Sequence, residues 1–319
     1  MTPRPKTVLV TGGAGFIGSH VAEAYRDAGW TVVVLDNFST GRRSNVTDGI
    51  EIVEMDVGDD ALPDVFREYG GFELVNHQAA QVDVRVSVAD PRRDARTNID
   101  GFLNVLEAAR RFEARRFVFA SSGGVVYGDA DRRPTREDAR KQPVSPYGVA
   151  KLAAEYYLWA SARVHGLEYA ALRYANVYGP RQDPSGEAGV VAIFCGRVAR
   201  GETLTIYGDG EQTRDYAFVT DVAQANLVVS QATLPEPRGL DDVAFNVGTG
   251  QETSVNELAA LLQRAVGRTV PVEHAPARPG ELEHSALDAA KLRALGWSPA
   301  VNREEGFART FRALTGADE

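Results

Sequence analysis

The fold is decided by the stretch Val8-Leu9-Val10-Thr11-Gly12-Gly13-Ala14-Gly15-Phe16-Ile17-Gly18 near the start of the chain. Its apolar beginning predicts a strand, and the residues after the glycines follow a helical pattern. In such a loop Gly12 permits a tight turn, Gly15 lets a pyrophosphate approach the backbone, and Gly18 lets the helix pack closely on the strand. The N-terminus of a helix also favours an anion. The stretch therefore predicts a dinucleotide-binding turn.

Strand and helix patterns alternate through the first half of the chain, as in βαβ units that build a parallel sheet. We expect a doubly wound α/β fold of the Rossmann type, with a dinucleotide-binding domain over residues 1–176. A smaller α/β substrate-binding lobe is expected over residues 177–319, where turns become frequent, with an approximate boundary and interleaved lobes. The expected strands are 7–10, 31–35, 51–55, 74–77, 117–120 and 169–172, and the expected helices are 17–28, 94–111 and 147–164.

Composition excludes several classes of protein. The net charge of −9 argues against a nucleic-acid or anionic membrane partner, so an anionic ligand needs locally placed arginines. The single cysteine, Cys195, excludes an intrachain disulfide and is expected in the core. The five histidines lack metal-ligand spacing, so no metal is expected. Because no apolar stretch reaches membrane length and residues 1–7 lack a signal-peptide core, we expect a cytoplasmic protein without membrane contact.

Two acidic residues follow predicted strands. Asp36 ends the second strand, where a carboxylate can accept hydrogen bonds from the adenosine ribose hydroxyls and repel a 2′-phosphate. This position favours NAD over NADP, although Asp36 could also simply cap the strand end. Asp56 and Val57 follow the third strand and could meet the adenine, although an ordinary turn aspartate is the plain alternative.

Tyr147 and Lys151 stand one helical turn apart, just after Pro146, a residue that suits a helix start. A tyrosine that is half ionised at neutral pH needs its pKa lowered by about 3 units, or roughly 4 kcal/mol. One cation at about 4 Å supplies around that much at an effective dielectric of ~20. The spacing could therefore make a base that helps to oxidise an alcohol, but alone it is also common on solvated helix faces.

These features together resemble the extended short-chain dehydrogenase/reductase family, and within it the UDP-glucose 4-epimerases. The resemblance spans nearly the whole chain, and its motifs are specific because many of them occur in one order. They are the glycine loop, Asp36-Asn37-Phe38, Asp56-Val57, Asn98, residues 121–128, Tyr147 with Lys151, residues 173–181, residues 210–221 with Arg214-Asp215-Tyr216, and residues 246–250.

The resemblance implies an enzyme that interconverts UDP-galactose and UDP-glucose, with NAD retained through turnover. Tyr147 would take the proton of the sugar 4-hydroxyl while hydride passes to NAD, and the 4-keto sugar would turn and receive the hydride on its other face. Lys151 would hold the cofactor ribose and lower the pKa of Tyr147. The implied cofactor contacts are Gly12, Gly15, Phe16, Ile17, Gly18, Asp36, Asn37, Asp56, Val57, Ala79, Ala80, Asn98, Tyr147, Lys151 and Tyr174.

The third catalytic residue of the family is a serine or threonine, and here the chain departs from a common form. The position often held by that residue is Gly123, so we assign the role to Ser122, with Ser121 as second choice. Loop serines satisfied by the backbone are the alternative.

The resemblance also implies a substrate site between the two lobes. Asn176, Arg214 and Arg278 would bind the diphosphate, because arginine forks match phosphate oxygens. A small residue at Ser285, beside the hexose, leaves room for an N-acetyl group and for the UDP-GalNAc/UDP-GlcNAc pair. The implied substrate contacts are Ser122, Tyr147, Asn176, Val190, Tyr207 near the uracil, Arg214, Arg278, Glu281 at the uridine ribose, and Ser285.

The same residues bear on other activities of the family. A 4,6-dehydratase usually carries Asp-Glu after the catalytic hydroxyl, whereas this chain has Gly123-Gly124. A UDP-glucuronate 4-epimerase or decarboxylase stays open, and an NAD-binding sensor or scaffold would be expected to lose Tyr147 or Lys151. The helices expected at 94–111 and 147–164 carry apolar residues on more than one face, so a homodimer through a helical bundle is expected unless one chain buries both faces.

Overall fold

A seven-stranded parallel sheet forms the centre of the computed structural model, which describes residues 6–184, 189–277 and 282–316. The strand order is β11-β6-β5-β4-β1-β2-β3, with every neighbouring pair parallel. The six strands expected from the sequence are confirmed, and β11 joins them. The bounds are β1 Thr7–Thr11, β2 Thr31–Asp36, β3 Glu51–Glu54, β4 Leu74–His77, β5 Arg116–Ser122, β6 Glu168–Tyr174 and β11 Ala244–Val247.

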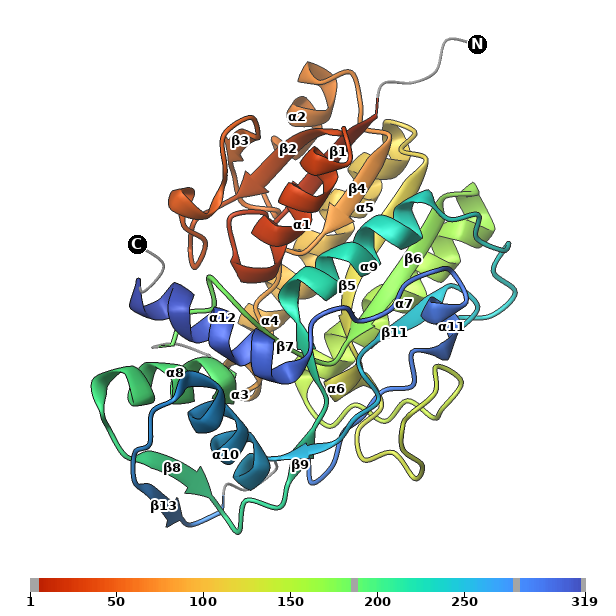
Figure 1. Cartoon of the computed structure of the whole chain (residues 1–319). Coiled ribbons are helices and arrows are strands. Elements are labelled where there is room, and N and C mark those ends of the chain that lie inside the picture. The colour runs from red at the N-terminus through yellow and green to blue at the C-terminus, as the bar shows by residue number, and fades with distance from the viewer. Residues whose placement is uncertain (1–5, 185–188, 278–281, 317–319) are drawn as a thin grey trace.

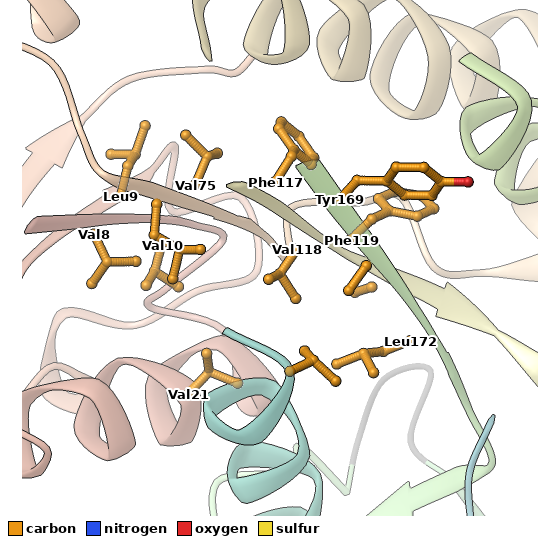
Figure 2. Close-up of a cluster of buried hydrophobic side chains, with 14 of the residues drawn as sticks. Val8, Leu9, Val10, Val21, Val75, Phe117, Val118, Phe119, Tyr169 and Leu172 are labelled. Atoms are coloured by element: carbon orange, nitrogen blue, oxygen red, sulfur yellow. The ribbon is translucent and has the colours of Figure 1, made fainter. Parts of the chain in front are cut away.

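Helices cover both faces of this sheet (Figure 1). On one face α1 (Phe16–Asp27) packs beside α9 (Val219–Gln231), and the other face is covered by α5 (Phe102–Arg111) and α7 (Pro146–His165), with α2 (Leu62–Glu68) near α5. Figure 2 shows the alternation that this layering requires, with side chains such as Leu9 on one side of the strands and Val8 on the other. Burial on both faces explains why the strands read as continuous apolar runs.

The helix expected from residue 94 to 111 is divided, so that expectation is corrected. It consists of α4 (Pro91–Ala95), a π-helical turn η2 (Arg96–Gly101) and α5. It begins earlier than expected because the Asp90 side chain accepts a hydrogen bond from the backbone N of Arg93 and Pro91 occupies the first turn.

A smaller part with its own hydrophobic core contains most of the chain after β6. This core includes Tyr178, Phe194, Leu258 and Phe307, and it buries Cys195 as expected. The elements of this part are β7 Asn176–Tyr178, α8 Val190–Arg200, β8 Leu204–Tyr207, β9 Thr213–Arg214, β10 Tyr216–Phe218, β12 Thr253–Ser254, α10 Val255–Val266, β13 Val272–Ala275 and α12 Arg303–Thr315.

The chain returns from the smaller part to the large sheet. Helix α9 lies on the sheet beside α1, and β11 pairs with β6, with Phe245 opposite Leu172. The two parts are therefore interleaved, and one cut after residue 176 does not separate them. The remaining short elements are η1 Arg43–Asn45, α3 Val84–Ala89, α6 Gly123–Val126 and α11 Ala290–Arg293.

Candidate active site

The glycine loop joins β1 to α1 in the manner the sequence predicts. Gly12 has a φ of 67°, and a Cβ on it would stand 2.6 Å from the backbone N of Ala79. A Cβ on Gly18 would collide with the carbonyl oxygen of Gly12. The loop thus packs against the segment that follows β4, and its backbone leads into the N-terminus of α1, which favours an anion such as a pyrophosphate.

Asp36 ends β2 and points back at the glycine loop. Its Oδ2 accepts a hydrogen bond from the backbone N of Ala14 at 2.9 Å, and its Oδ1 accepts one from Phe38 at 2.8 Å. The Asn37 side chain donates to Asp56 Oδ2 at 2.6 Å. Asp36 therefore does cap the strand end, and each oxygen of an ionised carboxylate keeps capacity for a ribose hydroxyl.

The predicted cofactor residues near β4 also hold each other in place. Asn98 binds both the backbone N and the carbonyl of Gln81, at 3.0 and 2.9 Å, and so fixes the loop that follows Ala79 and Ala80. The Tyr174 hydroxyl accepts a hydrogen bond from Asn226 Nδ2 at 2.8 Å. These contacts place the residues at the carboxyl ends of the strands, where doubly wound folds bind ligands.

Tyr147 and Lys151 lie on the buried face of α7. Ser145 caps this helix by accepting a hydrogen bond from the backbone N of Gly148 at 3.1 Å. Lys151 Nζ donates to the carbonyl of Ala120 at 2.8 Å and lies 5.7 Å from the centre of the Tyr147 ring. Only 9% of Tyr147 and 4% of Lys151 is exposed, so a solvated helix face is excluded.

Burial governs the titration of this pair. It lowers the pKa of Lys151 to about 8, against the opposing charges of Asp94 and Glu155. It raises the pKa of Tyr147 above the usual value, and the charge of Asp94 adds to this rise. Burial and the charge of Asp94 cause this rise, and the expectation that Lys151 lowers the pKa of Tyr147 stays a prediction. The positive charge of an oxidised nicotinamide is what the site needs to favour the phenolate.

The two candidate serines at the end of β5 differ. Ser121 Oγ donates to Glu155 Oε1 at 2.5 Å, and Arg173 Nη2 donates to Glu155 Oε2 at 2.6 Å. This buried network occupies Ser121, which argues against it as the third catalytic residue. Ser122 has no hydrogen-bond partner for its hydroxyl in the described ranges, and it stays the assigned residue.

The packing of Leu287 explains why position 123 is a glycine. A Cβ there would stand 2.5 Å from Cδ1 of Leu287, which is fully buried. Leu287 therefore occupies the space that a serine or threonine at position 123 would need.

On the substrate side, the structure brings Asn176, Arg214 and Ser285 together. The backbone N of Asn176 donates to the carbonyl of Asp215 at 3.0 Å, and the backbone N of Ser285 donates to Thr213 at 3.1 Å. Tyr207 ends β8 and Val190 begins α8, and both are half-buried. The predicted residues Arg278 and Glu281 lie outside the described residues.

Three buried acidic residues near the predicted catalytic and substrate residues were not identified from the sequence. Asp94, only 1% exposed, accepts hydrogen bonds from Gln81 and Asn98. Glu155 is four residues after Lys151, a spacing that could have placed it on the same buried face. The sequence indicated Asp215 only as the central residue of the Arg214-Asp215-Tyr216 motif. The described residues contain no cluster of His, Cys, Asp or Glu suited to a metal ion, and none of their helices could cross a membrane.

A Rossmann-type sheet, a glycine loop and a buried Tyr-Lys pair define a dinucleotide-binding protein of the short-chain dehydrogenase/reductase type. A model of the NAD dependent epimerase/dehydratase family matches residues 8–248, and the chain belongs to this family.

Relatives match nearly the whole length of the chain. The UDP-glucose 4-epimerase of Mycolicibacterium smegmatis is 44% identical over 95% of this chain and 96% of its own length. The UDP-glucose 4-epimerase of Thermotoga maritima, solved with UDP-glucose, is 44% identical with a TM-score of 0.92, covering 98% of this chain and 100% of that one. The Thermus thermophilus UDP-glucose 4-epimerase, solved with NAD, is 44% identical with a TM-score of 0.90, covering 98% and 99%.

Proposed function

We propose that the protein is a UDP-glucose 4-epimerase that interconverts UDP-galactose and UDP-glucose with NAD retained in the site. The buried pair of Tyr147 and Lys151 at the carboxyl ends of the strands carries this proposal, together with the identity to epimerases over the full chain. Comparison with these relatives does not favour a UDP-glucuronate 4-epimerase or decarboxylase.

The reaction needs a proton acceptor at the sugar 4-hydroxyl and a partner for the hydride. Bound NAD supplies reversible hydride acceptance. Tyr147 removes the proton of the 4-hydroxyl and returns it after the sugar has turned, and Ser122 hydrogen-bonds the same oxygen. Lys151, anchored on Ala120, holds the cofactor ribose and keeps a positive charge beside the phenol.

Individual side chains account for the choice of cofactor and for the binding of the substrate. Asp36 at the end of β2 selects NAD over NADP, because its carboxylate repels a 2′-phosphate. Asn176 and Arg214 bind the diphosphate, together with the predicted Arg278. The small side chain of Ser285 admits an N-acetyl group, so UDP-GalNAc and UDP-GlcNAc are further proposed substrates.

The test uses purified protein, UDP-galactose and no added cofactor, with the product sugars separated. UDP-glucose in the product mixture supports both the reaction and a retained NAD. Tyr147→Phe removes only the hydroxyl and should abolish turnover, so equal rates for this variant and the parent would overturn the catalytic assignment. Absence of UDP-GlcNAc turnover by an active preparation would remove the wider substrate range.

The proposed assembly is a cytoplasmic homodimer. Helix α7 exposes apolar side chains, with Val149 at 54%, Tyr156 at 52% and Tyr157 at 45% exposure. Val149 and Tyr157 line a groove together with Pro91 and Ile99. Pairing of these helices with a second copy would bury this apolar face. Light scattering on Tyr157→Glu should show monomers where the parent is dimeric.

A further inference from the structure

Asp215 is a fully buried carboxylate between β9 and β10. Its Oδ1 accepts hydrogen bonds from the backbone N and the hydroxyl of Thr249, at 2.9 and 2.6 Å. Its Oδ2 accepts hydrogen bonds from the backbone N of Gly250 at 2.9 Å and of Leu287 at 3.2 Å. The side chain of Asp215 thus links two loops that are far apart in sequence to the junction between β9 and β10.

The segments joined at Asp215 carry the proposed substrate contacts. Arg214 is the residue before Asp215. The backbone carbonyl of Asp215 accepts a hydrogen bond from the backbone N of Asn176 at 3.0 Å. Ser285 stands two residues before Leu287, on the same segment. A displacement of Asp215 would therefore move the diphosphate contacts and the hexose contact at once.

Asp215 also connects these contacts to the catalytic side of the cleft. Leu287, held by Asp215, packs against Gly123, the residue after Ser122. The loop with Thr249 and Gly250 follows β11, a strand of the large sheet. A Cβ on Gly248 would stand 2.5 Å from Asp215 Oδ2, so this loop can approach so closely only because position 248 is glycine.

We propose that Asp215 is a positioning residue for the sugar nucleotide, holding the diphosphate and hexose contacts at the correct distance from Tyr147. This inference rests on the proposed epimerase function. An ionised carboxylate is required because all its partners here act as donors. An asparagine amide has only one acceptor oxygen, so its NH₂ group must face at least one of the three backbone N–H groups.

Asp221 offers a matched control. It is 4% exposed, and its oxygens accept hydrogen bonds from the backbone N of Ala300 at 3.1 Å and of Val301 at 3.2 Å. Burial raises the pKa of both aspartates above the usual value. Among the described residues, Asp221 makes no hydrogen bond to the proposed substrate contacts, so Asp221→Asn measures the general effect of neutralising a buried carboxylate that holds a loop.

The experiment compares Asp215→Asn and Asp221→Asn with the parent as holoenzymes, measuring KM for UDP-galactose, kcat, NAD content and Tm. Both variants should lower Tm and keep their NAD. Asp215→Asn should raise KM by about ten-fold or more, because binding groups are displaced, whereas Asp221→Asn should stay within about two-fold. A KM for Asp215→Asn no higher than that of Asp221→Asn would overturn the proposal.

A milder variant covers the case in which Asp215→Asn does not fold. Thr249→Val removes the hydroxyl donor to Oδ1 and leaves the backbone donor, and it should raise KM by about two- to five-fold. An unchanged KM would count against the positioning role. If the parent itself shows no turnover, the epimerase proposal fails, and calorimetric binding of UDP to the same variants still tests Asp215 separately.

Discussion

Replacing Lys151 by methionine should make the protein more stable and inactive. The side chain is buried, and its pKa is lowered from 10.5 to about 8. This shift corresponds to about 3 kcal/mol by which burial disfavours the ammonium in the folded state. Methionine removes the charge at similar length, but it leaves the carbonyl of Ala120 without its 2.8 Å donor, which costs about 1–2 kcal/mol. The net gain in the free energy of unfolding is about 1–2 kcal/mol at pH 7.

The gain should appear as a rise in Tm of about 2–3 °C for a chain of this length. Differential scanning calorimetry on protein stripped of NAD measures it, because bound NAD would stabilise the two proteins unequally. Lys141→Met is the matched control. Lys141 forms an ion pair with Asp241 and donates to the carbonyl of Glu137, so its replacement should lower Tm.

The pH dependence of the stability difference between the parent and Lys151→Met can refute this reasoning. Between pH 8 and 10.5 the unfolded parent binds a proton at Lys151 that the folded parent does not, so the parent's stability rises with pH relative to Lys151→Met. The advantage of the methionine variant is complete below pH 8, disappears at about pH 9 and is reversed by pH 10.5, where the lost hydrogen bond to Ala120 remains. A variant that is less stable at pH 7, or whose advantage is independent of pH, would show that Lys151 is not held charged against its burial.

Three further outcomes follow from the same geometry. The kcat of the parent should fall by about ten-fold per pH unit above about pH 8, where Lys151 loses its proton, and a flat profile to pH 10 would contradict this. Gly18→Ala should lose bound NAD, measured in the supernatant after denaturation, because its Cβ meets the carbonyl of Gly12; full NAD content would show that the loop can shift. Gly123→Ala should lower the free energy of unfolding by about 1–3 kcal/mol in a urea titration, because its Cβ would stand 2.5 Å from buried Leu287. An unchanged urea midpoint for this last variant would mean that Leu287 repacks freely.

Local sequence signals predicted the framework well. The glycine loop, the apolar runs and the Pro146 helix start depend on neighbouring residues, and each appears in the structure within a few residues of its expected bounds. The division of the helix around Arg96–Gly101 was missed, because a π-helical turn has no distinct periodicity in so short a segment.

The titration of the catalytic pair could not be predicted in the same way. The i and i+4 spacing of Tyr147 and Lys151 places them on one face, but it does not say how deeply that face is buried. Desolvation depends on β5, α4 and α7 packing together, and it raises the pKa of Tyr147. The same packing brings Glu155 to Ser121 and gives that serine a buried hydrogen-bond acceptor.

By itself the sequence determined the Rossmann sheet, the glycine loop between a strand and a helix, and the shared helix face of Tyr147 and Lys151, because turn geometry and side-chain periodicity act over short distances along the chain. Only the tertiary structure decided the return of β11 to the sheet, the burial that lowers the pKa of Lys151, and the hydrogen bonds of Asp215 to two distant loops. These depend on contacts between segments tens of residues apart, whose energies come from desolvation and hydrogen bonding that exist only once the chain has folded.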